Sequence, residues 1–413
     1  MVITSNINSN RLWRTLMELG KIGANCEEAE GVTRLSLSRE ELEGKHYIYQ
    51  LMEEVGLNVH IDAVGNVIGK LQGSDPQAPV VMVGSHTDTV FNGGRFDGAL
   101  GVLGAIEAVR TIKETNIALT HTIEIVSFTD EEGSRFGTGY IGSKAMAGML
   151  KETIFDLKDK DGVSYHQAFI DAQLNPEKYK EVIRKPEDIK AYIEMHIEQA
   201  KVLEELDLPI GIVTDIQGPV WLEVTLEGAA DHAGATPMTM RKDVAVAVAE
   251  IVLAVEKIAL TYHGVATVGV ITLEPGGVNV IPGRAVFSID VRHGDKGIRQ
   301  KMINDIYEKI ESTCKKRRLT SRIDVKKEVD PATCSPEIVT LLEEMCHTLH
   351  YPVKKLPCGA GHDSLIMSKM TDIGMIFVRS KDGISHNPKE WSSQSDCAIG
   401  TELLFHTLVK LAQ

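Results

Sequence analysis

A short, wholly apolar run at residues 79–84 is the feature that most limits how this chain can fold. A run without polar alternation is typical of a strand buried on both faces of a sheet. Three further segments predict strands, at residues 121–128 and 189–196 and, again as a short apolar run, at 375–378. Helix-like periodicity lies between and around them, at residues 98–109, 141–150 and 337–349. This alternation predicts an α/β layer, preceded by a hairpin at residues 57–71.

The pattern changes in the middle of the chain. The segments expected there are, in order, a strand at 220–226, a helix at 244–260, strands at 265–273 and 285–291, a helix at 298–314 and a strand at 321–327. That βαββαβ order predicts a ferredoxin-like domain inserted into the α/β domain. We therefore expect a catalytic domain formed by residues 1–212 and 331–413, and an inserted domain at 213–330. Gly and Pro punctuation without strong periodicity predicts hinges at 211–218 and 330–335.

Composition excludes several classes of partner. The chain carries 44 Lys and Arg against 58 Asp and Glu, and its net charge of -14 opposes binding to nucleic acid or an anionic membrane. No stretch has the apolar core of a signal peptide or the length of a membrane span. The 6 cysteines are scattered, without the two-residue gap of a zinc knuckle or redox motif. We therefore expect free thiols and a cytoplasmic protein.

Histidines and carboxylates follow the predicted strands at the points where they end. His86 and Asp88 come directly after the run at 79–84, and Asp97 stands beside Gly98 before a predicted helix. Glu131 and Glu132 follow the strand at 121–128, His196 ends the strand at 189–196, and His386 lies in a later loop. Open α/β folds place their ligand sites at the carboxyl ends of their strands. These side chains are therefore expected at one edge of the sheet.

Imidazole and carboxylate donors without thiolate suit zinc, manganese or cobalt, and the residue types do not choose among them. A shared carboxylate can hold two cations about 3.5–4 Å apart. Each piece also has a plainer reading, because a single strand His is commonly a core residue and an Asp-Glu-Glu run is commonly a solvated turn. Five such coincidences at one sheet edge favour the metal site.

At this point the ordered motifs resemble the aminoacylase and carboxypeptidase clan of two-metal hydrolases. Within that clan the chain resembles the hydantoinase/carbamoylase subfamily, which includes N-carbamoyl-L-amino-acid hydrolases, allantoate amidohydrolases and β-ureidopropionases. The resemblance runs nearly end to end, and its most specific parts are residues 84–88, 92–98, 131–136, 196–199, 231–238, 359–363 and 383–386. It implies a metallopeptidase-like catalytic domain with a mixed central sheet, and an inserted lid and dimerisation domain.

The resemblance also implies the roles of the metal-site residues. His86, Asp97 and His196 would hold one divalent cation, and Asp97 would bridge to a second cation held by Glu132 and His386. Glu131 would be the general base, which takes a proton from the attacking water and returns it to the leaving nitrogen. Asp88 would accept a hydrogen bond from His86 and fix its tautomer.

Six residues would contact a small carboxylate-bearing ureido or carbamoyl substrate: Gln199, His232, Asn279, Arg292, Gly359 and Ala360. By the resemblance, His232 would reach the active site of the partner subunit in a homodimer and stabilise the developing oxyanion. Arg292 would clamp the substrate carboxylate. From the residues alone, His232 is plausibly a surface-turn His, and Asn279 has a turn-forming Asn as its alternative reading. A solvated strand-end Arg is the commoner reading of Arg292.

The expected reaction is hydrolysis of an N-carbamoyl-L-amino acid to the amino acid, carbon dioxide and ammonia. Allantoate is the nearest alternative, because it also places a ureido group beside a carboxylate. β-Ureidopropionase, aminoacylase and peptidase activities on the same scaffold are more distant ones. A non-catalytic binding protein would be expected to lack a ligand or the base, and this sequence retains all of them.

Overall fold

The structure, a computed structural model, describes residues 7–24 and 31–413, so that Cys26 lies outside the described residues. Two compact units are present. The first comprises the described residues up to Thr214 together with Thr333–Gln413, and the second is Asp215–Ala332. The boundaries expected at 212/213 and 330/331 each lie two residues before the boundaries between these units. We describe each unit by itself.

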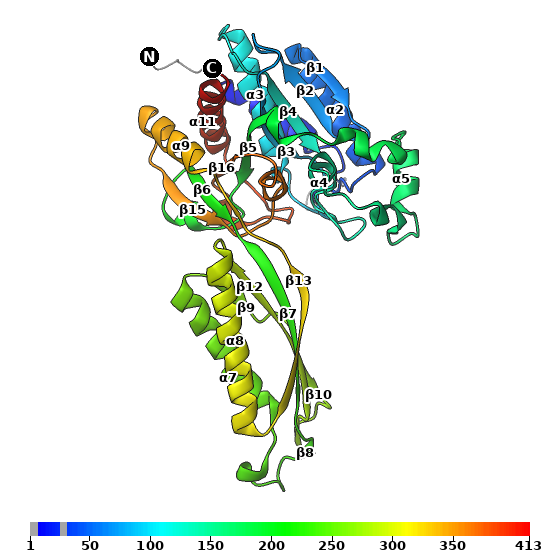
Figure 1. Cartoon of the computed structure of the whole chain (residues 1–413), viewed down its shortest axis with the longest axis vertical. Coiled ribbons are helices and arrows are strands. Elements are labelled where there is room, and N and C mark those ends of the chain that lie inside the picture. The colour runs from blue at the N-terminus through cyan, green and yellow to red at the C-terminus, as the bar shows by residue number, and fades with distance from the viewer. Residues whose placement is uncertain (1–6, 25–30) are drawn as a thin grey trace. The chain divides into compact units, whose positions relative to one another are not determined.

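The first unit is built on a mixed sheet, which in the described part of the chain has nine strands (Figure 1). Its order is β1 (Asn58–Ile61), β2 (Val67–Leu71), β4 (Ile123–Phe128), β3 (Val80–His86), β5 (Ile189–Ile197), β16 (Ile373–Val378), β6 (Ile210–Ile216) and β14 (Ala332–Thr333), with β15 (Lys354–Cys358) paired to β6. The central strands β4, β3, β5 and β16 are parallel, whereas β1, β2 and β6 pair antiparallel. The predicted mixed α/β fold is confirmed.

Helices cover both faces of this sheet. One face packs against α1 (Ser9–Leu19), α2 (Arg39–Val55), α3 (Ala99–Glu114), α9 (Pro336–Thr348) and α11 (Gln394–Ala412), whose apolar side chains share one core with the strands. The other face contacts α4 (Ile141–Met146) and α10 (Asp363–Met367). Side chains alternate along β5, so Met195 enters the core whereas Glu194 accepts hydrogen bonds from Ser364 of α10. Shorter helices lie at α5 (Tyr165–Asp171) and α6 (Val202–Glu205).

Local signals explain where the longer helices begin and end. The side chain of Ser38 accepts a hydrogen bond from the backbone N–H of Glu41 and so caps the start of α2. Gly56 ends that helix with a φ of 76°, a left-handed conformation that glycine adopts without strain. Ser393 caps α11 in the same way as Ser38 caps α2. Among the described residues, no helix combines the length and the hydropathy that a membrane crossing requires.

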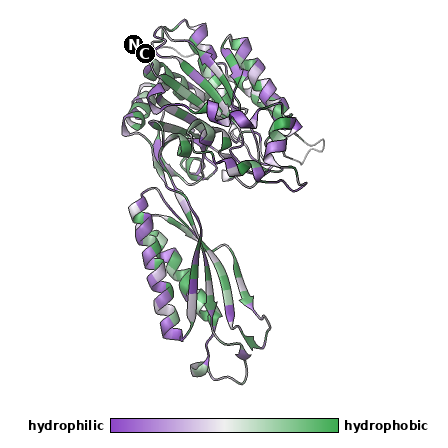
Figure 2. Ribbon diagram, turned by 45° about the vertical axis from the view of Figure 1, so that its right-hand side comes forward, coloured by the Kyte–Doolittle hydropathy of each residue, from purple (hydrophilic) through white to green (hydrophobic). Residues whose placement is uncertain are grey.

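The second unit is an antiparallel sheet with two long helices. Its strands lie in the order β10 (Ile271–Glu274), β12 (Arg284–His293), β7 (Gly218–Glu227) and β13 (Thr320–Glu328), and β9 (Val265–Thr267) also pairs with β12. Alternate residues of β7 and β12 enter a core with α7 (Val244–Tyr262) and α8 (Lys296–Arg317). Hydrophobic residues recur along these strands (Figure 2). A separate pair is formed by β8 (Asp231–His232) and β11 (Val280–Ile281).

Three expectations about elements were wrong. The single strand predicted at 265–273 is two strands, β9 and β10. The segment at 211–218 contains the boundary between the two units, as expected of a hinge, but it is not irregular: most of it is strand β6, whose apolar residues pair with β16 and enter the sheet core. The helix predicted at 141–150 ends at Met146, where Ala147 and Gly148 close it and Gly148 has a φ of 67°.

Candidate metal centre

The candidate metal ligands lie where the central parallel strands of the first unit end. His86 is the last residue of β3, and His196 is near the end of the neighbouring strand β5. Glu131 and Glu132 follow β4, which pairs with β3 on its other side. Parallel strands bring their carboxyl ends to one edge, so residues distant in sequence become neighbours. His386 joins them from the loop between β16 and α11.

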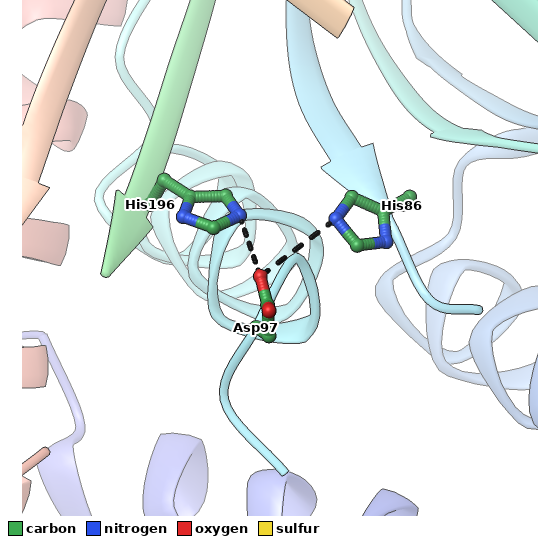
Figure 3. A group of neighbouring side chains, drawn as sticks. All are labelled: His86, Asp97 and His196. Atoms are coloured by element: carbon green, nitrogen blue, oxygen red, sulfur yellow. Dashed lines mark ion pairs between the residues drawn. The ribbon is translucent and has the colours of Figure 1, made fainter. Parts of the chain in front are cut away.

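Three groups of these donors could each hold a metal ion. They are His86, Asp97 and His196; His86, Glu131 and Glu132; and Asp97, Glu132 and His386, and within each group the ligand atoms lie within 4.8 Å of one another. Figure 3 shows His86 and His196 directed at the Asp97 carboxylate from two strand ends. Asp97 Oδ1 is 3.1 Å from His196 Nε2 and 4.0 Å from His86 Nε2. Its other oxygen, Oδ2, is 3.1 Å from His386 Nε2.

The hydrogen bonds of the two strand histidines fix which ring nitrogen can bind a cation. His86 Nδ1 lies 3.0 Å from the backbone carbonyl of Asp88, and His196 Nδ1 lies 2.9 Å from that of Ile197. A carbonyl only accepts, so each Nδ1 carries a hydrogen, and Nε2 is the ring nitrogen that faces Asp97 and is left to bind a cation. Metal-bound imidazoles usually have this arrangement.

Asp88 contacts the site in two ways. Its backbone carbonyl takes the His86 N–H, while its carboxylate lies 3.5 Å from the same nitrogen. The carboxylate also accepts hydrogen bonds from the backbone N–H groups of Glu131 and Glu132, both at 3.2 Å. Asp88 therefore joins the loop of the candidate base to the strand that carries His86.

Crowded carboxylates dominate the electrostatics of this site. Burial raises the pKa of Glu131 well above its usual range, with His86 opposing and Glu132 adding to the shift. Burial and the neighbouring Asp97 raise the pKa of Glu132 to about 7. Burial also disfavours the Asp97 anion, but hydrogen bonds from His196 and His386 hold the pKa of Asp97 well below its usual range. Because like charges repel strongly in a buried site, a divalent cation would stabilise this cluster.

The unpaired atoms fit the same conclusion. Among the described residues, Glu131 Oε1 and Glu132 Oε1 are buried without a hydrogen-bond partner, and only Glu132 Oε1 has an ion-pair contact, 3.4 Å from His386 Nε2. A buried carboxylate oxygen without a donor costs free energy unless another group compensates it. The donors around these atoms are imidazole and carboxylate, which suit borderline and hard divalent cations. The residues present therefore fit a bound divalent metal.

Gly98 is needed where Asp97 meets the start of α3. Its φ is 64°, and a Cβ placed on it would lie 2.4 Å from His86 Nε2. Only glycine avoids both the strained backbone and the overlap with the imidazole ring. The glycine beside Asp97 therefore allows the ligand loop to approach the ring of His86.

The predicted substrate contacts fall into separate groups. In the first unit, Gln199 Nε2 lies 3.1 Å from Asp97 Oδ2, and Gly359 and Ala360 follow β15 in the loop before α10. In the second unit, the chain segments of His232 and Asn279 meet, because Ala233 N–H donates to the Asn279 carbonyl at 2.9 Å. The Arg292 side chain, on β12, forms an ion pair of 2.6 Å with Asp290.

Sequence reasoning assigned no role to three residues beside the centre. The buried ring of His362 lies 4.2 Å from the ring of His196, measured between centroids. Glu390 accepts hydrogen bonds from the backbone of the Asp97 loop, and the Ser385 hydroxyl lies within hydrogen-bond distance of the carboxylates of both Asp97 and Glu390. His362 was inside a recognised motif, at residues 359–363. Ser385 was inside another recognised motif, at residues 383–386. Glu390 gave no signal, because a single Glu in a loop carries no periodicity.

A mixed α/β sheet with imidazole and carboxylate groups at the ends of its parallel strands is the scaffold of a metal-dependent hydrolase. Residues 56–410 match peptidase family M20/M25/M40, and the chain belongs to that family, whose enzymes are metal-dependent.

Relatives with named activities narrow the kind of metal-dependent hydrolase that this chain resembles. An N-carbamoyl-L-amino acid amidohydrolase of Geobacillus stearothermophilus is 46% identical over 98% of this chain and 99% of its own length. The allantoate amidohydrolase of Bacillus subtilis (strain 168) is 37% identical over 95% of each chain. A solved structure, the amidase of the hydantoinase/carbamoylase family from Burkholderia multivorans, is 34% identical with a TM-score of 0.91 and covers 98% of each chain. The resemblance to hydantoinase/carbamoylase amidases is thus confirmed.

Proposed function

We propose that this protein hydrolyses the ureido C–N bond of an N-carbamoyl-L-amino acid, releasing the amino acid, carbon dioxide and ammonia. The observation that carries the proposal is the buried cluster around Asp97, in which Glu131 stands among candidate metal ligands. The choice of substrate rests on similarity, because the carbamoyl-amino-acid relative is 46% identical and the allantoate relative 37%. Allantoate hydrolysis is the second candidate.

The ligand groups support a centre of two divalent cations, with zinc or manganese preferred. His86, Asp97 and His196 would hold one cation, and Asp97, Glu132 and His386 the other. When bound, such cations acidify a water molecule and polarise a carbonyl group. Asp97 would serve both, because its two oxygens face different histidines.

Glu131 would move the proton. Its Oε1 is buried without a partner, and its Oε2 lies 3.8 Å from His86 Nε2, so it stands beside the proposed ligands. Glu131 takes a proton from water as the water oxygen bonds to the ureido carbonyl carbon. It then gives that proton to the amino-acid nitrogen as the C–N bond breaks. The carbamate released decomposes to carbon dioxide and ammonia.

The remaining assignments concern substrate and assembly. Gln199, Gly359 and Ala360 of the first unit would contact the substrate, together with His232, Asn279 and Arg292 of the second. We propose a homodimer in which His232 acts in the active site of the partner subunit, with the inserted unit as lid and dimerisation domain. Cys314, Cys346 and Cys397 are buried, free cysteines, which suits a cytoplasmic enzyme.

Ammonia release tests the proposal. Purified protein, stripped with a chelator and reloaded with manganese or zinc, is assayed with N-carbamoyl-L-methionine, allantoate and N-carbamoyl-β-alanine in parallel. We expect the carbamoyl-L-amino acid to be preferred and the stripped sample to be inactive. Preference for allantoate would change the proposed substrate and leave the proposed mechanism unchanged. Full activity without metal would refute the mechanism, and silence on all three substrates with metal bound would refute the function.

A further inference from the structure

Glu390 is a buried carboxylate whose hydrogen bonds all go to segments that carry proposed metal ligands. The residue is 2% exposed. Glu390 Oε1 accepts from the backbone N–H of Phe96 at 2.9 Å and from that of Asp97 at 3.1 Å. Its other oxygen, Oε2, accepts from the hydroxyl of Ser385 at 2.9 Å. One carboxylate thus connects the loop of Asp97 with the loop of His386.

The Ser385 hydroxyl joins Glu390 to the Asp97 side chain as well. Ser385 Oγ lies 3.0 Å from Asp97 Oδ2 and 2.9 Å from Glu390 Oε2. A hydroxyl has a single proton, so it serves one of these carboxylates at a time. Gln199 Nε2 completes the contact, at 3.1 Å from Ser385 Oγ and 3.1 Å from Asp97 Oδ2.

The Asp97 loop is shaped to fit Glu390. A Cβ on Gly94 would lie 2.0 Å from the Glu390 carboxylate, so a larger residue at that position would displace this carboxylate. Burying a carboxylate is unfavourable unless its oxygens are hydrogen-bonded, and here the donors are two backbone amides and one hydroxyl. Such fixed donors hold the loop in one position, and the orientation of the Asp97 carboxylate depends on that position.

We propose that Glu390 is a positioning residue that holds the Asp97 carboxylate so that each of its oxygens faces a different cation. Oδ1 is then directed to His196 and Oδ2 to His386, as the distances of 3.1 Å on both sides require. Ser385 transmits the same constraint to the His386 loop. This inference rests on the proposed function, because it assigns Glu390 a role through the proposed bridging ligand.

Four variants test this role: Glu390→Ala, Glu390→Gln, Ser385→Ala and, as matched control, Asp159→Ala. The Asp159 carboxylate also accepts two backbone N–H groups and one side chain, from Asp161, Val163 and Arg135, but none of them is a proposed ligand. The side chain of Asp159 is 6% exposed. Its removal therefore reproduces the loss of a buried, hydrogen-bonded carboxylate elsewhere in the first unit.

Two readouts are used besides turnover. Manganese titration by calorimetry gives the stoichiometry and affinity, and hydrogen exchange of the metal-free protein reports on the amides of Phe96 and Asp97. For Glu390→Ala we expect faster exchange at these amides, manganese affinity weaker by about 10–100-fold and a lower kcat at similar KM. Glu390→Gln keeps a carbonyl oxygen for both amides, so its affinity should stay within a few-fold of wild type. Ser385→Ala should lie between these two variants.

The outcomes separate the two proposals. Wild-type manganese affinity in folded Glu390→Ala would overturn the role of Glu390, as would equal losses in Asp159→Ala. If Glu390→Ala does not fold, unchanged manganese affinity in Ser385→Ala overturns the proposed link between the loops, and weakened affinity supports it. A wild-type protein that binds no metal would instead contradict the proposed function, while the amide exchange would still report whether Glu390 holds the loop.

Discussion

At the scale of single residues, backbone atoms orient much of the candidate centre. The carbonyls of Asp88 and Ile197 set the tautomers of His86 and His196, and the amides of Glu131 and Glu132 are held by the Asp88 carboxylate. Backbone groups are present whatever the side chain, so they leave no trace in a sequence. A substitution of a ligand therefore removes one donor while the arrangement around it persists.

Replacing the proposed base should separate metal binding from turnover. We expect Glu131→Gln to retain metal and to lose about 10²–10⁴-fold in kcat, because glutamine cannot accept the proton. We expect His386→Ala to lose metal, because it removes the donor 3.1 Å from Asp97 Oδ2. Metal analysis and steady-state kinetics check both, with His347→Ala, an exposed histidine in α9, as control. Full metal content in His386→Ala would contradict the ligand assignment.

Gly98→Ala tests the contact between the ligand loop and His86. The new methyl group would overlap the imidazole ring, and the φ of 64° would be strained, so both metal affinity and the free energy of unfolding should fall. Gly162→Ala is the control, since Gly162 has a φ of 81° and its new methyl group would have no other atom within 4 Å. Calorimetry and urea unfolding should show that only Gly98→Ala loses metal affinity. If both variants lost metal affinity and free energy of unfolding to the same extent, backbone strain alone would be responsible.

The residue types of the centre could be predicted from sequence, but their support could not. His86, Asp97 and His196 could be predicted as ligands because each ends or follows a recognisable strand or precedes a predicted helix. Glu390 was not, because its importance comes from a contact with a loop 294 residues away in the chain. Only the tertiary fold brings such a pair together.

At the scale of elements, the helices and strands that could be predicted were those whose sequences carry one strong hydrophobic pattern. Strands β3, β4 and β5 are buried along nearly their whole length, so their sequences are rich in apolar residues. Strand β6 looked irregular because of Gly211, yet that glycine is required there, since a Cβ would lie 2.5 Å from the Leu356 side chain. Glycine marked close packing of strands in this case, where sequence reasoning expected a hinge.

One buried carboxylate of β4, that of Glu124, should make the stability of the first unit depend on pH. Glu124 is bonded to Lys70 at 2.8 Å and Arg184 at 2.9 Å. Burial raises its pKa, but Arg184 and Lys70 outweigh this and leave the pKa of Glu124 below its usual value. Its stabilising effect is therefore complete above the unfolded-state pKa of about 4.3 and is lost as pH falls through the lower folded-state pKa.

We accordingly expect Glu124→Gln to lower the free energy of unfolding by about 1.5–3 kcal/mol at neutral pH, and by less as the pH is lowered below about 4. Urea unfolding of metal-free protein across this range measures the difference. The control is Glu181→Gln, which removes an exposed partner of Lys178 and should change stability little. A difference from wild type that grows toward acid pH would contradict this sign.

At the scale of the whole molecule, the proposed roles require two copies of the chain. The proposed base is in the first unit, and His232 is in the second. If His232 acts in the partner's active site, a defect in one copy can be compensated by the other.

Mixed dimers test this arrangement. Glu131→Gln and His232→Ala should each be inactive alone, and co-refolding or subunit exchange should restore about a quarter of the wild-type activity, since half the dimers are mixed and each has one intact site. Activity measured against the mixing ratio gives the result. A mixture as inactive as its components would place His232 and Glu131 of the same chain in one site, and full activity of His232→Ala alone would remove His232 from catalysis.

The second unit is inserted into the first, so the two segments of the first unit are synthesised at different times. Phe96 and Glu390 share a hydrogen bond across 294 residues of chain. At about 5–20 residues per second, a ribosome would take roughly 15–60 s between making the two. The second unit, with its own core, is fully synthesised within that interval. The candidate metal centre can therefore be completed only after the inserted unit has been synthesised, and a chain released before residue 386 would carry the inserted unit without a complete centre.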